Sequence, residues 1–326
     1  MPRELWGYIA KRALEAIPLF FFIIIVSFTL VHLAPGDPVV RMIGEGVSIS
    51  PELYNKVRAE MGLDRPIYEQ LLAYLQKVIQ GDLGFSYFYN QPVANLIAER
   101  LLATLLLMFT AMSISSVIGI LLGVVSSQKP YSKTDNFFTT LSLVGYSLPL
   151  FWTGQIFILV FAIGLGLLPA QGFVSLRTTL FGFDYVIDVL SHLVLPASTY
   201  ALYSLALMTR LTRASMLETL RKDFILTARS KGLADRTVIF RHGLRNALLP
   251  VVTIMGINFG FMLAGSVLVE TVFSWPGLGR LLYDAITGRD YTTVMGMLII
   301  ISTMVIISNL IVDIAYAYID PRISHR

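Results

Sequence analysis

RKDFILTARSKGLADRTVIFRHGLRNALLP, residues 221–250, is the stretch around which the rest of the chain is organised, because it interrupts a strongly apolar sequence with charge. Asp223 is a candidate N-cap for a short helix, since its carboxylate can accept the unpaired N–H groups of a first helical turn. Gly232 then stands where a left-handed residue is needed to end that helix. Asp235 offers a second cap. The stretch predicts a helix, a glycine stop and a second helix, which together form a compact basic elbow.

The composition is that of a polytopic membrane protein. Hydrophobic residues make up 55% and charged residues only 14% of the 326 positions, which is far more apolar than an average soluble domain. The chain contains no cysteine, so disulfide scaffolds, thiolate metal sites and cysteine nucleophiles are excluded.

Spans that cross a membrane as helices need about 20 mostly apolar residues. The candidate spans are 9–32, 101–126, 136–165, 193–217, 248–271 and 292–317. Their even number puts both termini on one side of the membrane. We interpret the first span as uncleaved, because its apolar stretch is too long for a signal peptide. The predicted fold is all-α, with six transmembrane helices.

Charge sets the expected orientation. The elbow and the ends of its flanking spans carry mainly basic residues, which marks the cytoplasmic side. These residues are Arg210, Arg213, Arg221, Lys222, Arg229, Lys231, Arg236, Arg241 and Arg245, against Glu218, Asp223 and Asp235. We therefore expect a multi-pass membrane protein with cytoplasmic N- and C-termini.

The expected domains follow from these spans. Residues 1–32 hold the N-terminus and first span, and residues 33–100 are too long for a simple connector. Helical apolar patterns after Pro51 and Pro66 predict a small helical subdomain there, on the extracytoplasmic side. This subdomain is either a docking surface or a structural cap. Residues 101–317 form the transmembrane core with a cytoplasmic loop at 218–247, and 318–326 form a cytoplasmic tail.

Several motifs together resemble one family. TARSKGL at 227–233 and RHGLRNALLP at 241–250 are similar to the cytoplasmic coupling loop of ABC importer permeases, and most similar to B-type subunits of dipeptide and oligopeptide permeases. Leu226 and Thr227 depart from the generic importer signature, and Leu249-Pro250 falls later than in it. The turn at 33–40, the segment 81–93, the segment 273–291 and the terminal Asp-Pro-Arg at 320–322 extend the resemblance over nearly the whole chain.

The resemblance implies a type I ABC importer permease fold, a location in the plasma (inner) membrane of a prokaryote, and a set of partners. These partners are a homologous C-type permease, two ATP-binding subunits, an extracytoplasmic substrate-binding protein and membrane lipid. No nucleic-acid partner, catalytic residue, metal site or cofactor is expected in this chain, since ATP and Mg would be bound by the partner subunits. The residues expected to contact an ATP-binding subunit are Ala228, Arg229, Lys231, Gly232 and Leu233.

Polar residues inside the spans are candidates for a translocation pathway, because such groups are rare in lipid. They are Gln155, Thr253, Asn258 and Ser266. Helix packing is the alternative explanation for each of them. Gly119 and Gly123 form a small-xxx-small pair that permits close helix approach, and Asp290 is read as the cap of the sixth span.

The resemblance further implies that the chain is a subunit of an ATP-driven importer of di- or oligopeptides that works by alternating access. The chain itself has no Gly-x-x-x-x-Gly-Lys-Ser/Thr loop to cradle ATP phosphates. Relatives that transport nickel chelates or oligosaccharides leave the substrate open. An ion-coupled secondary transporter is the alternative from a different class, and paired intramembrane charges or inverted repeats would favour it.

Overall fold

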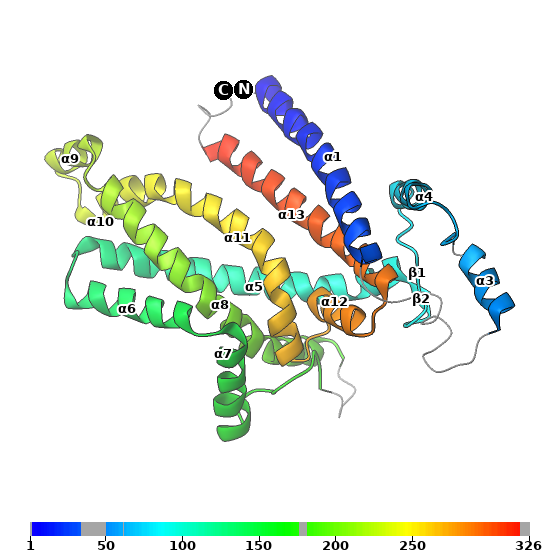
Figure 1. Ribbon diagram of the computed structural model, residues 1–326. Coiled ribbons are helices and arrows are strands. Elements are labelled where there is room, and N and C mark those ends of the chain that lie inside the picture. Colours follow the sequence, from blue (N-terminus) through cyan, green and yellow to red (C-terminus); the bar gives the residue numbers. More distant parts are fainter. Residues whose placement is uncertain (1, 34–49, 61, 176–180, 320–326) are drawn as a thin grey trace.

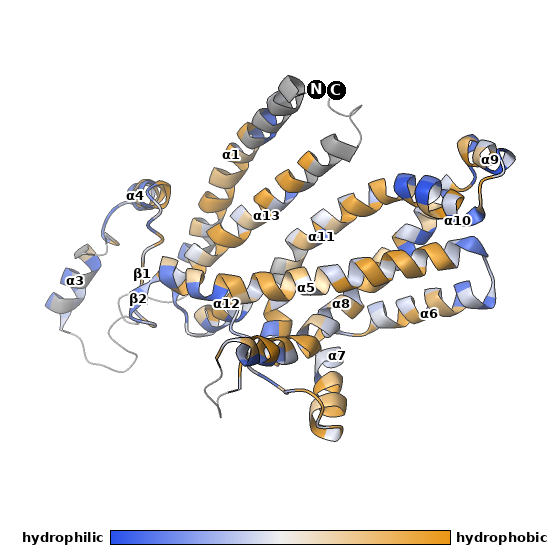
Figure 2. Cartoon of the chain, turned by 180° about the vertical axis from the view of Figure 1, so that it is seen from behind, coloured by the Kyte–Doolittle hydropathy of each residue, from blue (hydrophilic) through white to orange (hydrophobic). Residues whose placement is uncertain are grey.

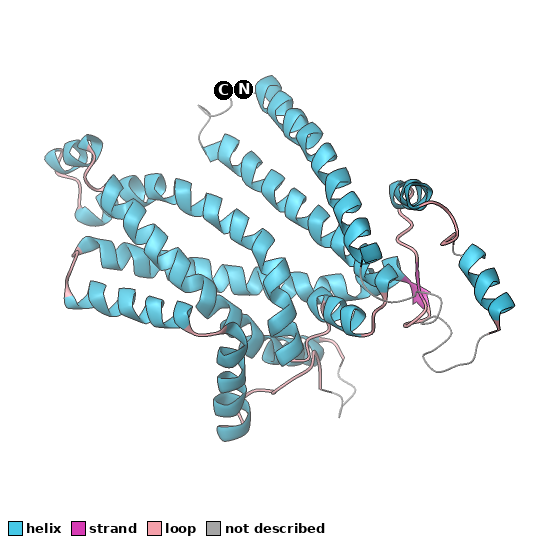
Figure 3. Ribbon diagram, viewed as in Figure 1, coloured by secondary structure: helices cyan, strands magenta, loops and turns pink. Residues whose placement is uncertain are grey.

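The computed structural model describes residues 2–33, 50–60, 62–175 and 181–319 (Figure 1). The described chain is helical apart from one two-stranded antiparallel hairpin (Figure 3). The turn motif from residue 34 to 40 and the terminal Asp-Pro-Arg at 320–322 lie outside the described residues. The elements are α1 Pro2–Leu33, α3 Pro51–Glu60, α4 Ile67–Ile79, β1 Phe85–Ser86, β2 Gln91–Pro92, α5 Val93–Gln128, α6 Lys133–Ser147, α7 Leu150–Phe157, η1 Ile158–Gly164, α8 Phe183–Thr219, α9 Asp223–Ser230, α10 Asp235–Thr237, η2 Val238–Leu244, α11 Arg245–Val272, α12 Leu278–Thr287 and α13 Tyr291–Ile319.

Five of the expected spans fall within single long helices, namely α1, α5, α8, α11 and α13. Among the described residues, α5, α8 and the 291–311 part of α13 are long and apolar enough to cross a membrane, and α1 holds a shorter apolar stretch at 14–29. The all-α membrane fold is therefore confirmed. Figure 2 shows the apolar residues spread along these helices and the polar ones gathered toward their ends.

The expected single helix at 136–165 is wrong. Two helices occupy this range, α6 and the pair α7–η1, and they meet at an angle of 101°. The break lies at Leu148 and Pro149, whose ψ angles of 134° and 133° are extended rather than helical. Proline lacks an N–H and disfavours the helical region for the residue before it, so Pro149 ends α6 and starts α7 at a new angle.

The predicted helices of the 33–100 segment are confirmed within its described part. α3 starts at Pro51 and α4 follows Pro66, and the two lie at the end of the molecule opposite the elbow (Figure 1). The inward face of α4 buries Val78 in a cluster with Ile24 of α1 and Leu96 of α5. Within this subdomain, α4 is thus packed directly onto α1 and α5.

The hairpin β1–β2 is hydrogen-bonded to the start of α13. Ser86 Oγ donates to Asp290 Oδ2, and Thr293 N–H donates to Asp290 Oδ1 at 3.2 Å. Asp290 therefore caps α13, as predicted, and also holds the hairpin. Gly296 on α13 allows the start of α5 to approach, because a Cβ at that position would lie 2.6 Å from Val93 Cγ1. The hairpin, the start of α5 and the last long helix form one packed unit.

Candidate functional site

The elbow folds around a small apolar core of its own. Ile225 and Ala228 of α9 and Val238 of η2 are buried together against Leu220, which follows α8. Figure 2 shows hydrophilic residues along the elbow, interleaved with the hydrophobic ones of α9. A loop that merely connected two spans would have no need of such a core, so the elbow has a fixed shape.

The glycine stop is confirmed and the two aspartate caps are wrong. Gly232 has a φ of +74°, and its N–H donates to the Arg229 carbonyl at 2.9 Å, which ends α9 in the predicted left-handed conformation. The N-cap residues are Lys222 for α9 and Ala234 for α10, and neither makes a side-chain cap bond. Asp223 and Asp235 lie one residue later, where their charge favours the positive end of the helix dipole.

The residues predicted to contact an ATP-binding subunit are not all on one surface. Arg229, Lys231, Gly232 and Leu233 are exposed. Ala228 is only 6% exposed and lies in the apolar core of the elbow. Its place is one of internal packing, so a contact through the Ala228 side chain needs the elbow to open.

Two exposed apolar residues of α9 were missed by sequence reasoning. Phe224 is 40% exposed and Leu226 is 67% exposed. Both flank Ile225, which is buried, so α9 presents apolar side chains outward as well as inward. The sequence signal was available, because an eight-residue helix cannot bury apolar residues on every side.

The elbow rests on the ends of α5 and α8 that lie nearest to it. Val124 of α5, Met216 of α8 and Ala247 of α11 are buried in one cluster, which Leu220 and Ile239 also contact. Gly243 in η2 allows the close approach, since a Cβ there would lie 3.2 Å from Leu220 Cδ2. The core of the elbow and the core of the helix bundle are therefore continuous through Leu220.

α5 and α8 pack at unusually short range in this region. A Cβ on Gly119 would lie 2.6 Å from the Met208 Cβ, and one on Gly123 would lie 2.6 Å from the Thr212 Cβ. The predicted role of this glycine pair in close helix contact is confirmed.

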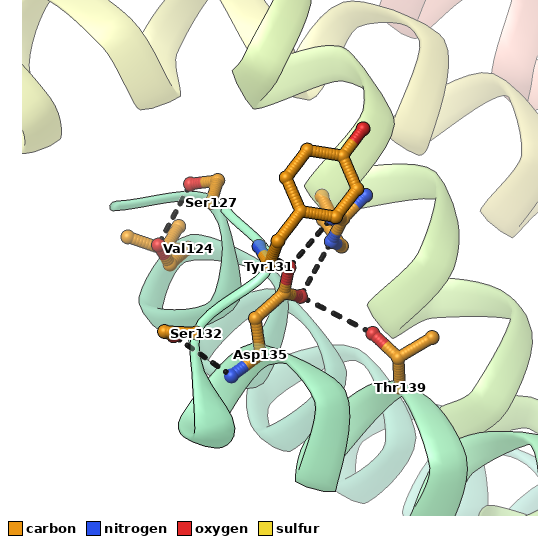
Figure 4. Close-up of polar contacts among 7 residues, drawn as sticks. Val124, Ser127, Tyr131, Ser132, Asp135 and Thr139 are labelled. Carbon is orange, nitrogen blue, oxygen red and sulfur yellow. Dashed lines mark hydrogen bonds and ion pairs between the residues drawn. The ribbon is translucent and has the colours of Figure 1, made fainter. Parts of the chain in front are cut away.

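A buried ion pair fastens α6 to α8 at the same level (Figure 4). Arg213 donates from Nε to Asp135 Oδ1 and from Nη2 to Oδ2, both at 2.6 Å. The Asp135 carboxylate also accepts from Tyr131 N–H at 2.8 Å and from Thr139 Oγ1 at 3.2 Å. Ser132 caps α6 by accepting from the Asp135 N–H. Every acceptor site of this carboxylate has a donor, as a buried charge requires.

The four candidate pathway residues do not form one site. Gln155 is exposed on α7, and its neighbour Gly154 lies against Val272 and Phe273, beyond the bend. Thr253 lies near the other end of α11, about 28 Å from Val272 at the helical rise per residue, and its hydroxyl donates to the Leu249 carbonyl at 3.0 Å. Asn258 is half-buried.

Ser266 is only 1% exposed, and its hydroxyl bonds the Glu270 carboxylate. It therefore belongs to a buried network rather than to an open surface. Within the described ranges, no three His, Asp or Glu side chains come close enough together to hold a metal ion.

Comparisons with known proteins agree along the whole chain. Residues 115–325 match the family model described as binding-protein-dependent transport system inner membrane component, and residues 5–108 match the model of the N-terminal part of such components. The chain is 42% identical to the dipeptide transport system permease protein DppB of Escherichia coli (strain K12), over 98% of this chain and 99% of that one. It is also 42% identical to the oligopeptide transport system permease protein AppB of Bacillus subtilis (strain 168), with the same coverage.

Among solved structures, the fold resembles a chain of the MetNI methionine ABC transporter in inward facing conformations. The TM-score is 0.57 at 17% identity, covering 69% of this chain and 96% of that chain. At this identity the likeness concerns the fold alone.

Proposed function

The chain belongs to the family of binding-protein-dependent transport system inner membrane components, and from that premise we propose that it is a B-type permease subunit of an ATP-driven importer of di- and oligopeptides. The relatives that support the peptide assignment are two full-length permeases from different bacteria, one for dipeptides and one for oligopeptides. The sequence alternatives, nickel chelates and oligosaccharides, have no support among these relatives.

The elbow is the observation that carries the coupling part of this proposal. It has its own apolar core, a fixed glycine stop and outward-facing Phe224, Leu226 and Leu233. Exposed apolar side chains on a rigid, basic helical projection favour burial in a groove of a partner protein. We assign that groove to an ATP-binding subunit, with Arg229 and Lys231 at its rim.

The work of the importer is then divided among subunits. Partner subunits bind ATP and Mg and hydrolyse ATP, an extracytoplasmic binding protein delivers the peptide, and this chain with a C-type permease encloses the pathway. Movement of the ATP-binding subunits displaces the elbow, and the long helices reorient between outward-open and inward-open states. Thr253 and Asn258 on α11 are the pathway residues that this proposal retains.

Co-purification tests the proposal directly. The tagged protein is isolated from its native host in detergent, as wild type, as Leu226→Asp and as the control Tyr68→Asp. Tyr68 on α4 is 62% exposed, close to the 67% of Leu226, but lies at the opposite end of the molecule. ATP-binding subunits are expected with the wild type and with Tyr68→Asp, and are expected to be lost with Leu226→Asp.

The alternative class of transporter gives the contrary result. If the wild-type protein is purified alone and an ion gradient drives its transport of a solute in liposomes, the protein is a secondary transporter. The importer proposal would then fail.

A further inference from the structure

Thr104 joins three helices through a single hydroxyl. It lies on α5 and is fully buried. Its Oγ1 donates to Glu270 Oε1 of α11 at 2.8 Å and accepts from the N–H of Leu278, the first residue of α12, at 2.7 Å. A hydroxyl has one proton and two lone pairs, so Thr104 satisfies a donor and an acceptor at the same time.

Helix α12 has no cap of its own. Its N-cap is Gly277, which has no side chain, and the unpaired N–H groups of the first turn are satisfied from other helices. Leu278 N–H donates to Thr104, and Arg280 N–H donates to Glu270 Oε2 at 2.9 Å. A Cβ on Gly277 would collide with the Glu270 carboxylate. The position of α12 is therefore fixed by α5 and α11 rather than by its own sequence.

The same contact extends to the loop before α12. Trp275 is fully buried, its indole N–H donates to the Ala103 carbonyl of α5 at 2.9 Å, and its backbone N–H donates to the Glu270 carbonyl at 2.8 Å. The loop is thus held to α5 at adjacent positions, 103 and 104. Any displacement of this part of α5 must carry the loop and the start of α12 with it.

The other end of α5 packs beneath the elbow. Val124 lies in the cluster with Met216 and Ala247, and Gly123 packs against Thr212. Thr104 and Val124 are separated by 20 residues of one helix, about 30 Å. α5 contains no proline, whereas α8 and α11 contain Pro196 and Pro250. Of the three helices that meet at the elbow, α5 is the one without a proline, the residue that removes a helical hydrogen bond.

We propose that Thr104 is a positioning residue for transport, through which α5 links the coupling elbow to α12 on the far side of the bundle. The inference rests on the proposed importer function and adds a route to it. Because such a link is reciprocal, a protein bound near α12 changes the elbow as much as the elbow changes α12. The exposed Tyr283 and Ile286 of α12 give such a protein a surface to contact.

The first test separates communication from folding. The complex is purified through a tag on this chain, reconstituted in nanodiscs, and its ATPase rate is measured with and without the purified binding protein saturated with L-alanyl-L-alanine. In Thr104→Val the shape of the side chain is kept and both hydrogen bonds are lost. Stimulation by the binding protein is expected to fall about fivefold or more, the lower range of measured site-to-site coupling, while the unstimulated rate is kept. Thr104→Ser retains the hydroxyl and is expected to restore stimulation.

A second pair of variants removes the partner of the hydroxyl instead. Leu278 is the first residue of α12, a position that accepts proline because its N–H is outside the helical ladder. The preceding Gly277 is already extended, with a ψ of −176°, as a residue before proline must be. Leu278→Pro deletes the N–H that donates a hydrogen bond to Thr104. Leu278→Ala truncates the side chain but keeps that N–H. Stimulation of the ATPase by the binding protein is expected to fall further in Leu278→Pro than in Leu278→Ala.

The outcomes are distinguishable. A wild-type complex without ATP-binding subunits or without stimulated ATPase refutes the importer function itself. A stimulated wild type with equal stimulation in Thr104→Val overturns the role of Thr104. An equal loss of stimulation in Leu278→Pro and Leu278→Ala also overturns the role of Thr104, whatever fraction of the complex assembles. The loss would then come from the side chain of Leu278.

Discussion

Gly123 of α5 faces Thr212 of α8 with no room for a side chain between them, because a Cβ on Gly123 would lie 2.6 Å from the Thr212 Cβ and 2.8 Å from the Thr209 carbonyl oxygen. Gly123→Ala is therefore expected to destabilise the protein by about 1–3 kcal/mol through overpacking. The midpoint of thermal unfolding in detergent, followed by tryptophan fluorescence, measures the effect.

Gly145→Ala is the matched control for this prediction. Gly145 also lies in a long helix next to α8, but its Cβ would meet Leu202 at 3.4 Å, an ordinary contact. Alanine has the higher helix propensity, so this change is expected to be neutral or slightly stabilising. Thr212→Gly should recover only part of the loss in Gly123→Ala, because the 2.8 Å contact with the Thr209 carbonyl oxygen remains. A midpoint equal to wild type in Gly123→Ala would show that the two helices separate at no cost.

The ion pair between Asp135 and Arg213 predicts a strongly asymmetric response to mutation. Arg213→Met leaves the Asp135 carboxylate, whose side chain is 2% exposed, without its cation, and is expected to cost about 3 kcal/mol. The double variant Asp135→Asn with Arg213→Met removes both charges and should recover much of that loss. Unfolding midpoints of the two single variants and the double variant form the required cycle.

The control for the ion pair is an exposed one. Lys222 Nζ lies 3.1 Å from Glu218 Oε1, with the two side chains 51% and 75% exposed. Lys222→Met is expected to change stability by less than about 1 kcal/mol, since water and salt screen such pairs. If it cost as much as Arg213→Met, burial would not explain the strength of the Asp135 pair.

Asp290 is expected to hold both the start of α13 and the hairpin. Asp290→Ala removes the cap of α13, worth about 1 kcal/mol, and also the acceptor of Ser86 Oγ. Amide hydrogen exchange in residues 85–93 and 291–296 should accelerate together. Asp290→Asn keeps a cap oxygen and should give an intermediate rate. Asp284→Ala, which removes a contact 3.9 Å from Arg280 and no hydrogen bond of the Asp290 cap, should leave both segments unchanged.

Much of the fold was predictable because its signals are local. The spans follow from apolar length, the stop at Gly232 from glycine, and the closeness of α5 and α8 from the spacing of Gly119 and Gly123. The break at Pro149 was missed because a proline in an apolar stretch does not always end a helix. Pro18, Pro196 and Pro250 all lie inside continuous helices. Whether a proline kinks or ends a helix depends on what packs around it, and the sequence does not contain that information directly.

The pairings that organise the candidate site connect residues far apart in the chain. Asp135 and Arg213 are 78 positions apart, and Thr104 and Glu270 are 166 apart. No periodicity or spacing rule joins such residues. Ser266 and Glu270 differ from them, because they are four positions apart on α11, a spacing that brings helical side chains together, and this pairing could have been found in the sequence. Ala228, expected to contact an ATP-binding subunit, has a buried side chain, and a helix as short as α9 gives too few residues to decide from the sequence which face is inward.

Gly232 provides the last prediction, which separates the shape of the elbow from its docking. No heavy atom lies within 4 Å of a Cβ built on Gly232, so a larger residue has space, but its φ of +74° is costly for any residue with a Cβ. Gly232→Ala is expected to cost about 1 kcal/mol, and Gly232→Asn less, because asparagine tolerates the left-handed region. Amide exchange in residues 223–233 should follow that order. Co-purification of ATP-binding subunits should persist in Gly232→Asn, whose exposed apolar residues are unchanged, and should be lost in Leu226→Asp, whose exchange rates stay at the wild-type level. Loss of the subunits in Gly232→Asn with normal exchange would instead place Gly232 itself in the contact.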